Sequence, residues 1–119
     1  MGELSVLVVD DEEDFVDTLL KRLRRKGVEC DGAYSGDGAK NKMLGRGFDV
    51  VLLDMRLADE DGNEVLKELQ AMSPETRFLI LSGYASASAG RAGIGCGAVD
   101  YLLKPVEFET LYEKIVEVC

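Results

Sequence analysis

The chain has 119 residues, of which 46% are hydrophobic, and it carries a formal net charge of −9. This length corresponds to about one domain, and the apolar content is enough for a core without disulfides. An acidic chain repels phosphates, so direct binding to nucleic acid is not expected. The sequence has no apolar run of about 18 residues and no secretory signal, so we expect a cytoplasmic protein without a membrane span.

The absence of histidine restricts the chemistry that this chain can perform. It excludes Ser-His-Asp and Cys-His nucleophile systems as well as imidazole metal ligands. The three cysteines, Cys30, Cys96 and Cys119, lack zinc-site spacing and are interpreted as reduced thiols. A bound metal would therefore need oxygen ligands, which points to Mg²⁺, Mn²⁺ or Ca²⁺.

Short apolar runs predict five β-strands. The clear runs are residues 4–9, 49–53, 78–81 and 98–103, and a weaker one is residues 28–33. Runs that are apolar on both faces are typical of buried parallel strands.

Amphipathic stretches between these runs predict helices. In the first, Phe15, Leu19 and Leu23 recur every four residues, and Gly27 is a candidate for the C-terminal cap. The basic cluster at its end is interpreted as a solvated helix end, with kinase docking as the alternative. Its members are Lys21, Arg22, Arg24, Arg25 and Lys26.

Four further helices are expected. The second starts at Ser35 and reaches about Gly45. The third starts at Asp61 and has an inner face that comprises Val65, Leu69 and Met72. The fourth, residues 86–97, should be short because it contains four glycines, each costing about 1 kcal/mol relative to alanine. The last follows Pro105.

Strands and helices in strict alternation predict an α/β fold with a parallel sheet covered on both faces. Such sheets bind ligands at the carboxyl ends of their strands. The residues at those ends are polar: Asp10, Asp11, Asp54, Ser82 and Lys104. Two carboxylates about 4 Å apart repel each other by roughly 4 kcal/mol at an effective dielectric near 20, so a group of them raises pKa values or binds a cation. A carboxylate beside such a cation can be the nucleophile in phosphoryl transfer.

Four segments, VLVVDDEEDF, DVVLLDMRL followed by DG, LILSGY and VDYLLKPV, resemble the response-regulator receiver family. The resemblance extends over nearly the whole chain. It implies one receiver domain over residues 1–119, with a flavodoxin-like, doubly wound, five-stranded parallel sheet in the order 2-1-3-4-5 and five helices.

The resemblance also implies roles for individual residues. Asp54 matches the phosphoacceptor. Asp10, Asp11 and Asp54 match the side chains that bind Mg²⁺ or Mn²⁺, together with the backbone carbonyl of Arg56. The family often has a proline at the position of Ala58, so the loop geometry there is open.

Four other positions match the family's switch machinery. Lys104 matches the lysine that pairs with a phosphoryl oxygen, and Ser82 matches the hydroxyl that turns toward the phosphoryl group. Tyr101 matches an aromatic side chain that reports activation. Pro105 matches the proline that follows a cis peptide bond from Lys104.

The implied function is a phosphoacceptor switch. Its partners would be a sensor histidine kinase or phosphotransfer protein and a downstream effector protein or domain. The chain would catalyse only its own phosphorylation and dephosphorylation, so it is not expected to be an enzyme. One alternative is a pseudo-receiver that docks partners without phosphorylation. Another is a haloacid-dehalogenase-type phosphohydrolase, although that family has Asp where this chain has Arg56. The sequence leaves open whether the domain stands alone or belongs to a longer protein.

Overall fold

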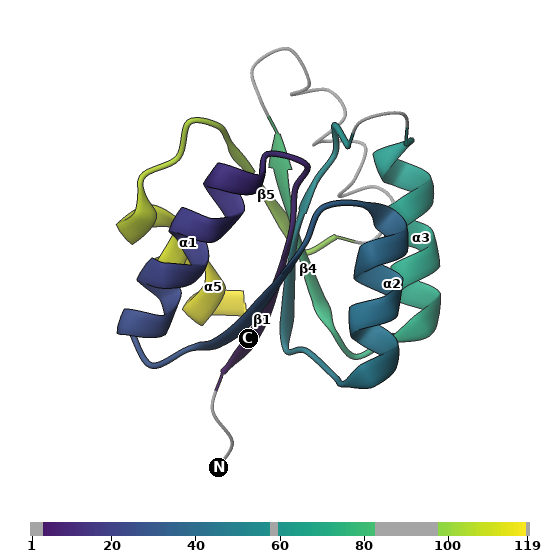
Figure 1. Cartoon of the computed structure of the whole chain (residues 1–119), viewed down its shortest axis with the longest axis horizontal. Coiled ribbons are helices and arrows are strands. Elements are labelled where there is room, and N and C mark those ends of the chain that lie inside the picture. Colours follow the sequence, from purple (N-terminus) through teal and green to yellow (C-terminus); the bar gives the residue numbers. More distant parts are fainter. Residues whose placement is uncertain (1–3, 58–59, 83–97, 119) are drawn as a thin grey trace.

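The structure is a computed structural model that describes residues 4–57, 60–82 and 98–118, with only the backbone described at Ser82 (Figure 1). The strands are β1 (Ser5–Val9), β2 (Glu29–Ala33), β3 (Val50–Asp54), β4 (Arg77–Ser82) and β5 (Asp100–Leu103). The helices are α1 (Glu13–Arg25), α2 (Gly36–Gly45), α3 (Gly62–Met72) and α5 (Phe108–Val118). The described part thus has four helices rather than five, and the predicted helix over residues 86–97 lies outside it.

The five strands form one parallel sheet in the order β2-β1-β3-β4-β5. This confirms the predicted flavodoxin-like arrangement. Helices α1 and α5 cover one face of the sheet, and α2 and α3 cover the other (Figure 1). Because all strands point the same way, the residues that follow β1, β3 and β5 come to the same edge.

Burial on both faces explains why the strand sequences are continuously apolar. Along β1, Val6 and Val8 pack into the cluster beneath α1 and α5, whereas Leu7 and Val9 pack into the cluster beneath α2 and α3. All four are fully buried. Each such side chain contributes about 1.5–3 kcal/mol relative to an exposed one, so the two clusters fix the position of the sheet between its helices.

Part of the basic cluster at the end of α1 contacts α5. The guanidinium of Arg22 lies 5.2 Å from the ring centroid of Phe108, and the ammonium of Lys26 lies 5.1 Å from that of Tyr112. Lys26 also pairs with Glu109 at 3.3 Å. The interpretation of this cluster as a solvated helix end is therefore incomplete, because two of its cations cover aromatic rings.

The predicted helix ends are largely confirmed. The Ser35 hydroxyl accepts a hydrogen bond from the Gly38 N–H at 3.0 Å, which caps α2. Asp61 caps α3 in the same way through the Asn63 N–H at 2.9 Å. Gly27 has φ of 82°, as expected for the residue after a helix. Met72 departs from the prediction: it is the last residue of α3, beyond the buried face, and is 38% exposed.

One glycine lets α3 approach the end of β3. A Cβ atom at Gly62 would lie 2.6 Å from the carbonyl oxygen of Met55 and 2.7 Å from its Cα. Met55 directly follows Asp54, so this close contact fixes the backbone next to the end of β3. In the described part of the chain, no helix is long and apolar enough to cross a membrane.

Replacing this glycine should destabilise the fold. We expect Gly62→Ala to lower the free energy of unfolding by about 1–3 kcal/mol, because the methyl group meets backbone rather than a mobile side chain. Urea unfolding would measure this. The matched control is Gly45→Ala, where a Cβ meets nothing within 4 Å. Equal stability of the two variants would contradict the packing explanation.

Candidate functional site

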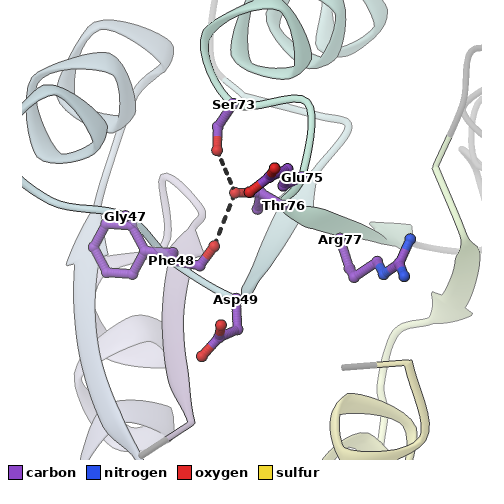
Figure 2. Close-up of a pocket in the computed structure, with 7 residues that line it drawn as sticks. All are labelled: Gly47, Phe48, Asp49, Ser73, Glu75, Thr76 and Arg77. Carbon is purple, nitrogen blue, oxygen red and sulfur yellow. Dashed lines mark hydrogen bonds between the residues drawn. The ribbon is translucent and has the colours of Figure 1, made fainter. Parts of the chain in front are cut away.

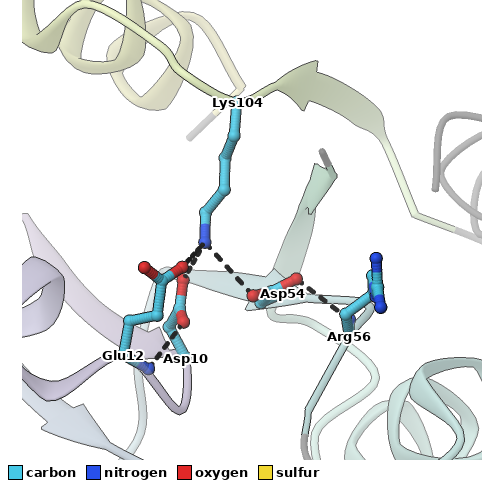
Figure 3. Close-up of polar contacts among 5 residues, drawn as sticks. All are labelled: Asp10, Glu12, Asp54, Arg56 and Lys104. Carbon is cyan, nitrogen blue, oxygen red and sulfur yellow. Dashed lines mark hydrogen bonds and ion pairs between the residues drawn. The ribbon is translucent and has the colours of Figure 1, made fainter. Parts of the chain in front are cut away.

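Three strands deliver charged side chains to one edge of the sheet. Asp10 follows β1, Asp54 is the last residue of β3, and Lys104 follows β5. Figure 3 shows the side chains of Asp10 and Asp54 directed at the ammonium group of Lys104. The Lys104 Nζ lies 2.6 Å from Asp10 Oδ2 and 3.2 Å from Asp54 Oδ2. The predicted meeting of these three residues is therefore confirmed, whereas their roles stay predictions.

A third carboxylate belongs to the same group. Glu12, which precedes α1, places Oε1 2.9 Å from Lys104 Nζ. In the sequence, Glu12 stands near the start of a predicted helix, where acids are common because they complement the helix dipole. Its participation depends on the direction of one side chain, and no spacing in the sequence reports that.

Backbone N–H groups hold the two aspartates in place. Asp10 Oδ1 accepts a hydrogen bond from the Glu12 N–H at 3.0 Å, and Asp54 Oδ1 accepts one from the Arg56 N–H at 2.9 Å. The side chain of Asp10 is fully buried, and that of Asp54 is 7% exposed. Each aspartate thus has one oxygen fixed by the backbone and one directed at Lys104.

The site holds more acidic than basic side chains. Burial raises the pKa of Asp10 to about 6, and hydrogen bonds from Lys104 and the Glu12 N–H offset this only in part. The charge of Asp54 also contributes to the raised pKa of Asp10. Burial also lowers the pKa of Lys104, but hydrogen bonds to Asp10 and Glu12 outweigh that effect, so its pKa is raised overall. One ammonium group therefore faces three carboxylates.

The donor set suits a hard divalent cation. Oxygen atoms of Asp10, Glu12 and Asp54 lie within 4.8 Å of one another. Mg²⁺ prefers carboxylate oxygens with several waters, and three carboxylates that face one ammonium group leave negative charge in excess here. Asp11, a predicted ligand, is exposed, and the group formed by the described acids does not include it. The predicted ligation by Asp11 and by the Arg56 carbonyl stays a prediction.

Pro105, Ser82 and Tyr101 are the remaining residues for which the sequence predicts a place or a role at the site. The peptide bond between Lys104 and Pro105 is cis, as predicted. Ser82 is the last residue of β4, at the same edge as the site, but its side chain lies outside what the structure describes. Tyr101 is partly buried and packs against the core beneath α2 and α3. The switching roles of Ser82 and Tyr101 are not tested by these positions.

A hollow of about 370 Å³ is shown in Figure 2. It lies where β3 and β4 begin, so it is at the opposite edge of the sheet from Lys104. Its lining residues are Gly47, Phe48, Asp49, Ser73, Glu75, Thr76 and Arg77. The Thr76 hydroxyl donates to the Phe48 carbonyl at 2.8 Å and lies 2.6 Å from the Ser73 hydroxyl, which joins the segments before β3 and β4. This hollow is remote from Lys104, and its hydrogen bonds are structural.

The pattern of residues at the sheet edge agrees with one protein family. The sequence profile of the response regulator receiver domain matches residues 6–116. The chain belongs to this family. The resemblance seen in the sequence is therefore confirmed at the level of the family. Receiver domains of two-component systems are signalling proteins rather than classical enzymes.

Individual proteins extend this comparison. The transcriptional regulatory protein ZraR of Salmonella typhimurium is 37% identical over 114 residues, which cover 96% of this receiver chain but only 26% of ZraR. A CheY-like receiver domain from Methanospirillum hungatei is 29% identical with a TM-score of 0.90, covering 98% of this chain and 93% of that one. A response regulator from Burkholderia pseudomallei, solved with a phosphorylated aspartic acid, calcium ion and citrate, is 30% identical with a TM-score of 0.86, covering 98% and 71%.

Removing one buried charge should stabilise the metal-free receiver. We expect Asp10→Asn to raise the free energy of unfolding by about 1–3 kcal/mol at pH 7.5 in a chelator. The folded-state pKa of Asp10, about 6, exceeds its ordinary value of 3.8, so ionisation costs stability as the pH rises from 3.8 through 6. The gain should therefore disappear as the pH falls toward 4.

Urea unfolding at several pH values provides the measurement. Asp14→Asn is the matched control, because Asp14 is an exposed acid in the first turn of α1 and its removal should cost less than about 1 kcal/mol. Saturating Mg²⁺ should stabilise the native chain more than the Asp10→Asn variant. A less stable Asp10→Asn protein at pH 7.5 would show that the ion pair with Lys104 outweighs the cost of burial.

Proposed function

We propose that this chain is a single receiver domain, residues 1–119, that accepts a phosphoryl group on Asp54 in the presence of Mg²⁺ or Mn²⁺. The supporting observation is the approach of Lys104 Nζ to both Asp10 and Asp54, at 2.6 and 3.2 Å. Residues so far apart in sequence converge at the edge where parallel sheets bind their ligands. Family membership supports the same assignment.

In the proposed reaction, an oxygen of Asp54 attacks the phosphorus of a phosphohistidine. The new O–P bond forms as the N–P bond of the donor breaks, and the imidazole leaves with that electron pair. The chain has no histidine, so the donor is a sensor histidine kinase or a phosphotransfer protein. The hydrogen bond from the Arg56 N–H orients the Asp54 carboxylate, and Lys104 supplies a positive charge beside it.

Asp10, Asp11 and Asp54 would hold the cation, with the backbone carbonyl of Arg56. When bound, the cation neutralises charge on the phosphoryl oxygens. Lys104 would pair with one of these oxygens, a contact that exists only after phosphorylation. Such state-specific contacts shift a conformational equilibrium, and Ser82 and Tyr101 would transmit the shift.

The output would be read by an effector protein or domain. ZraR is named a transcriptional regulatory protein, and this chain spans about a quarter of its length. The domain would catalyse only its own phosphorylation and dephosphorylation. A cytoplasmic location belongs to the proposal, since Cys30 is a free thiol and the reducing cytoplasm keeps thiols in that form.

Mass spectrometry after treatment with acetyl phosphate and Mg²⁺ tests the phosphorylation. We expect the native chain to gain the mass of one phosphoryl group, and Asp54→Asn to gain none. Asp14→Asn should label like the native chain, because this exposed acid lies on α1. Omitting the metal should prevent labelling, since the carboxylates would then repel the anionic donor.

Two outcomes would count against the proposal. A native chain that stays unlabelled at saturating Mg²⁺ would favour the alternative, a pseudo-receiver that docks partners without phosphorylation. Labelling of Asp54→Asn to the same extent as the native chain would place the modified residue elsewhere.

A further inference from the structure

We propose that Glu12 is a positioning residue that holds the ammonium group of Lys104 before phosphorylation and competes for it with a phosphoryl group on Asp54. The inference rests on the proposed function, because it assumes that Asp54 is the phosphoacceptor. It adds a role for a residue outside the predicted set. The geometry in Figure 3 shows Glu12 approaching Lys104 from the α1 side, next to Asp10.

Every N–H donor of the Lys104 ammonium group has an acceptor. A lysine ammonium has three N–H donors. Its three acceptors here are Asp10 Oδ2 at 2.6 Å, Glu12 Oε1 at 2.9 Å and Asp54 Oδ2 at 3.2 Å. The donors are thus fully used. Phosphorylation of Asp54 redirects the N–H that Asp54 accepts, and any further N–H of Lys104 reaches a phosphoryl oxygen only if Asp10 or Glu12 gives it up.

The carboxylates around Lys104 differ in how far they are exposed to solvent. The side chain of Asp10 is fully buried and that of Asp54 is 7% exposed, whereas that of Glu12 is 65% exposed. A carboxylate that loses its partner is solvated at once if it is exposed, but stays unpaired if it is buried. Of the two partners that stay unmodified, Asp10 and Glu12, Glu12 is therefore the one that Lys104 releases more easily.

The side chain of Glu12 is directed at Lys104 and not at its own helix. Glu12 is the N-cap residue of α1, yet its side chain makes no capping hydrogen bond and points instead to Lys104. Its backbone N–H is fixed by Asp10 Oδ1 at 3.0 Å. Phe15, one turn into α1, places its ring centroid 4.6 Å from Lys104 Nζ. The start of α1 therefore holds the ammonium group through a charge and an aromatic face.

The consequence is a competition that can be measured at equilibrium. Beryllofluoride is a tetrahedral analogue of a phosphoryl group and binds to a carboxylate without turnover. Its affinity for the native chain at saturating Mg²⁺ includes the cost of displacing Glu12 from Lys104. An exposed ion pair is worth about 0.2–1 kcal/mol, so removing it should tighten binding by up to about fivefold.

The experiment compares three variants of the full chain by fluorine NMR titration with beryllofluoride. Glu12→Gln should bind about 1.4- to fivefold more tightly than the native chain. Glu12→Asp should also bind more tightly, because its carboxylate keeps the charge but is one methylene too short to reach Lys104. Glu13→Gln, which removes an exposed neighbouring charge, should bind like the native chain. Nitrogen NMR of the Lys104 ammonium should show the same shift in both Glu12 variants without beryllofluoride.

Each contrary result has a distinct meaning. Glu12→Gln that binds like Glu13→Gln would overturn the inference while leaving the proposed function intact. Glu12→Asp that binds like the native chain would also overturn it, because charge alone rather than contact with Lys104 would then explain the effect. A native chain that fails to bind beryllofluoride with Mg²⁺ would overturn the proposed function and this inference together.

Discussion

One ammonium group placed among three carboxylates is the interaction on which this site depends. Lys104 lies within 3.2 Å of oxygens from Asp10, Glu12 and Asp54. Lys104 follows β5, at one side of the sheet, and its ammonium group reaches the ends of the neighbouring strands β1 and β3. Its single positive charge leaves an excess of negative charge, which makes the site receptive to a cation, while burial raises the pKa of Asp10.

The fold can accommodate this unfavourable group because the rest of the sheet is covered on both faces. Strands that are apolar on each side pack into two separate clusters, and Gly62 brings α3 against the backbone after Asp54. The two aspartates are each held through one oxygen by a backbone N–H group, that of Glu12 for Asp10 and that of Arg56 for Asp54. A rigid frame with an unbalanced charge at its edge is the arrangement that the proposed phosphoryl switch would use.

The sequence was sufficient for the parts of the site that follow from strand ends. Asp54 and Lys104 could be placed together because parallel strands finish at one edge, but strand order came only from the family resemblance, since periodicity does not identify neighbours. Glu12 could not be assigned, because an acid at a helix start equally suits the dipole. The contact of Arg22 with Phe108 was also missed, since it depends on how α1 and α5 pack.

Paramagnetic NMR with Mn²⁺ tests the central claim most directly, namely that distant residues form one cation site beside Asp54. We predict that the backbone amides of Asp10, Arg56 and Lys104 broaden together at substoichiometric Mn²⁺. Those of Phe48 and Thr76, at the opposite edge of the sheet, should stay sharp. Broadening that spares the residues after β1 and β3, or that affects Phe48 and Thr76 equally, would contradict it.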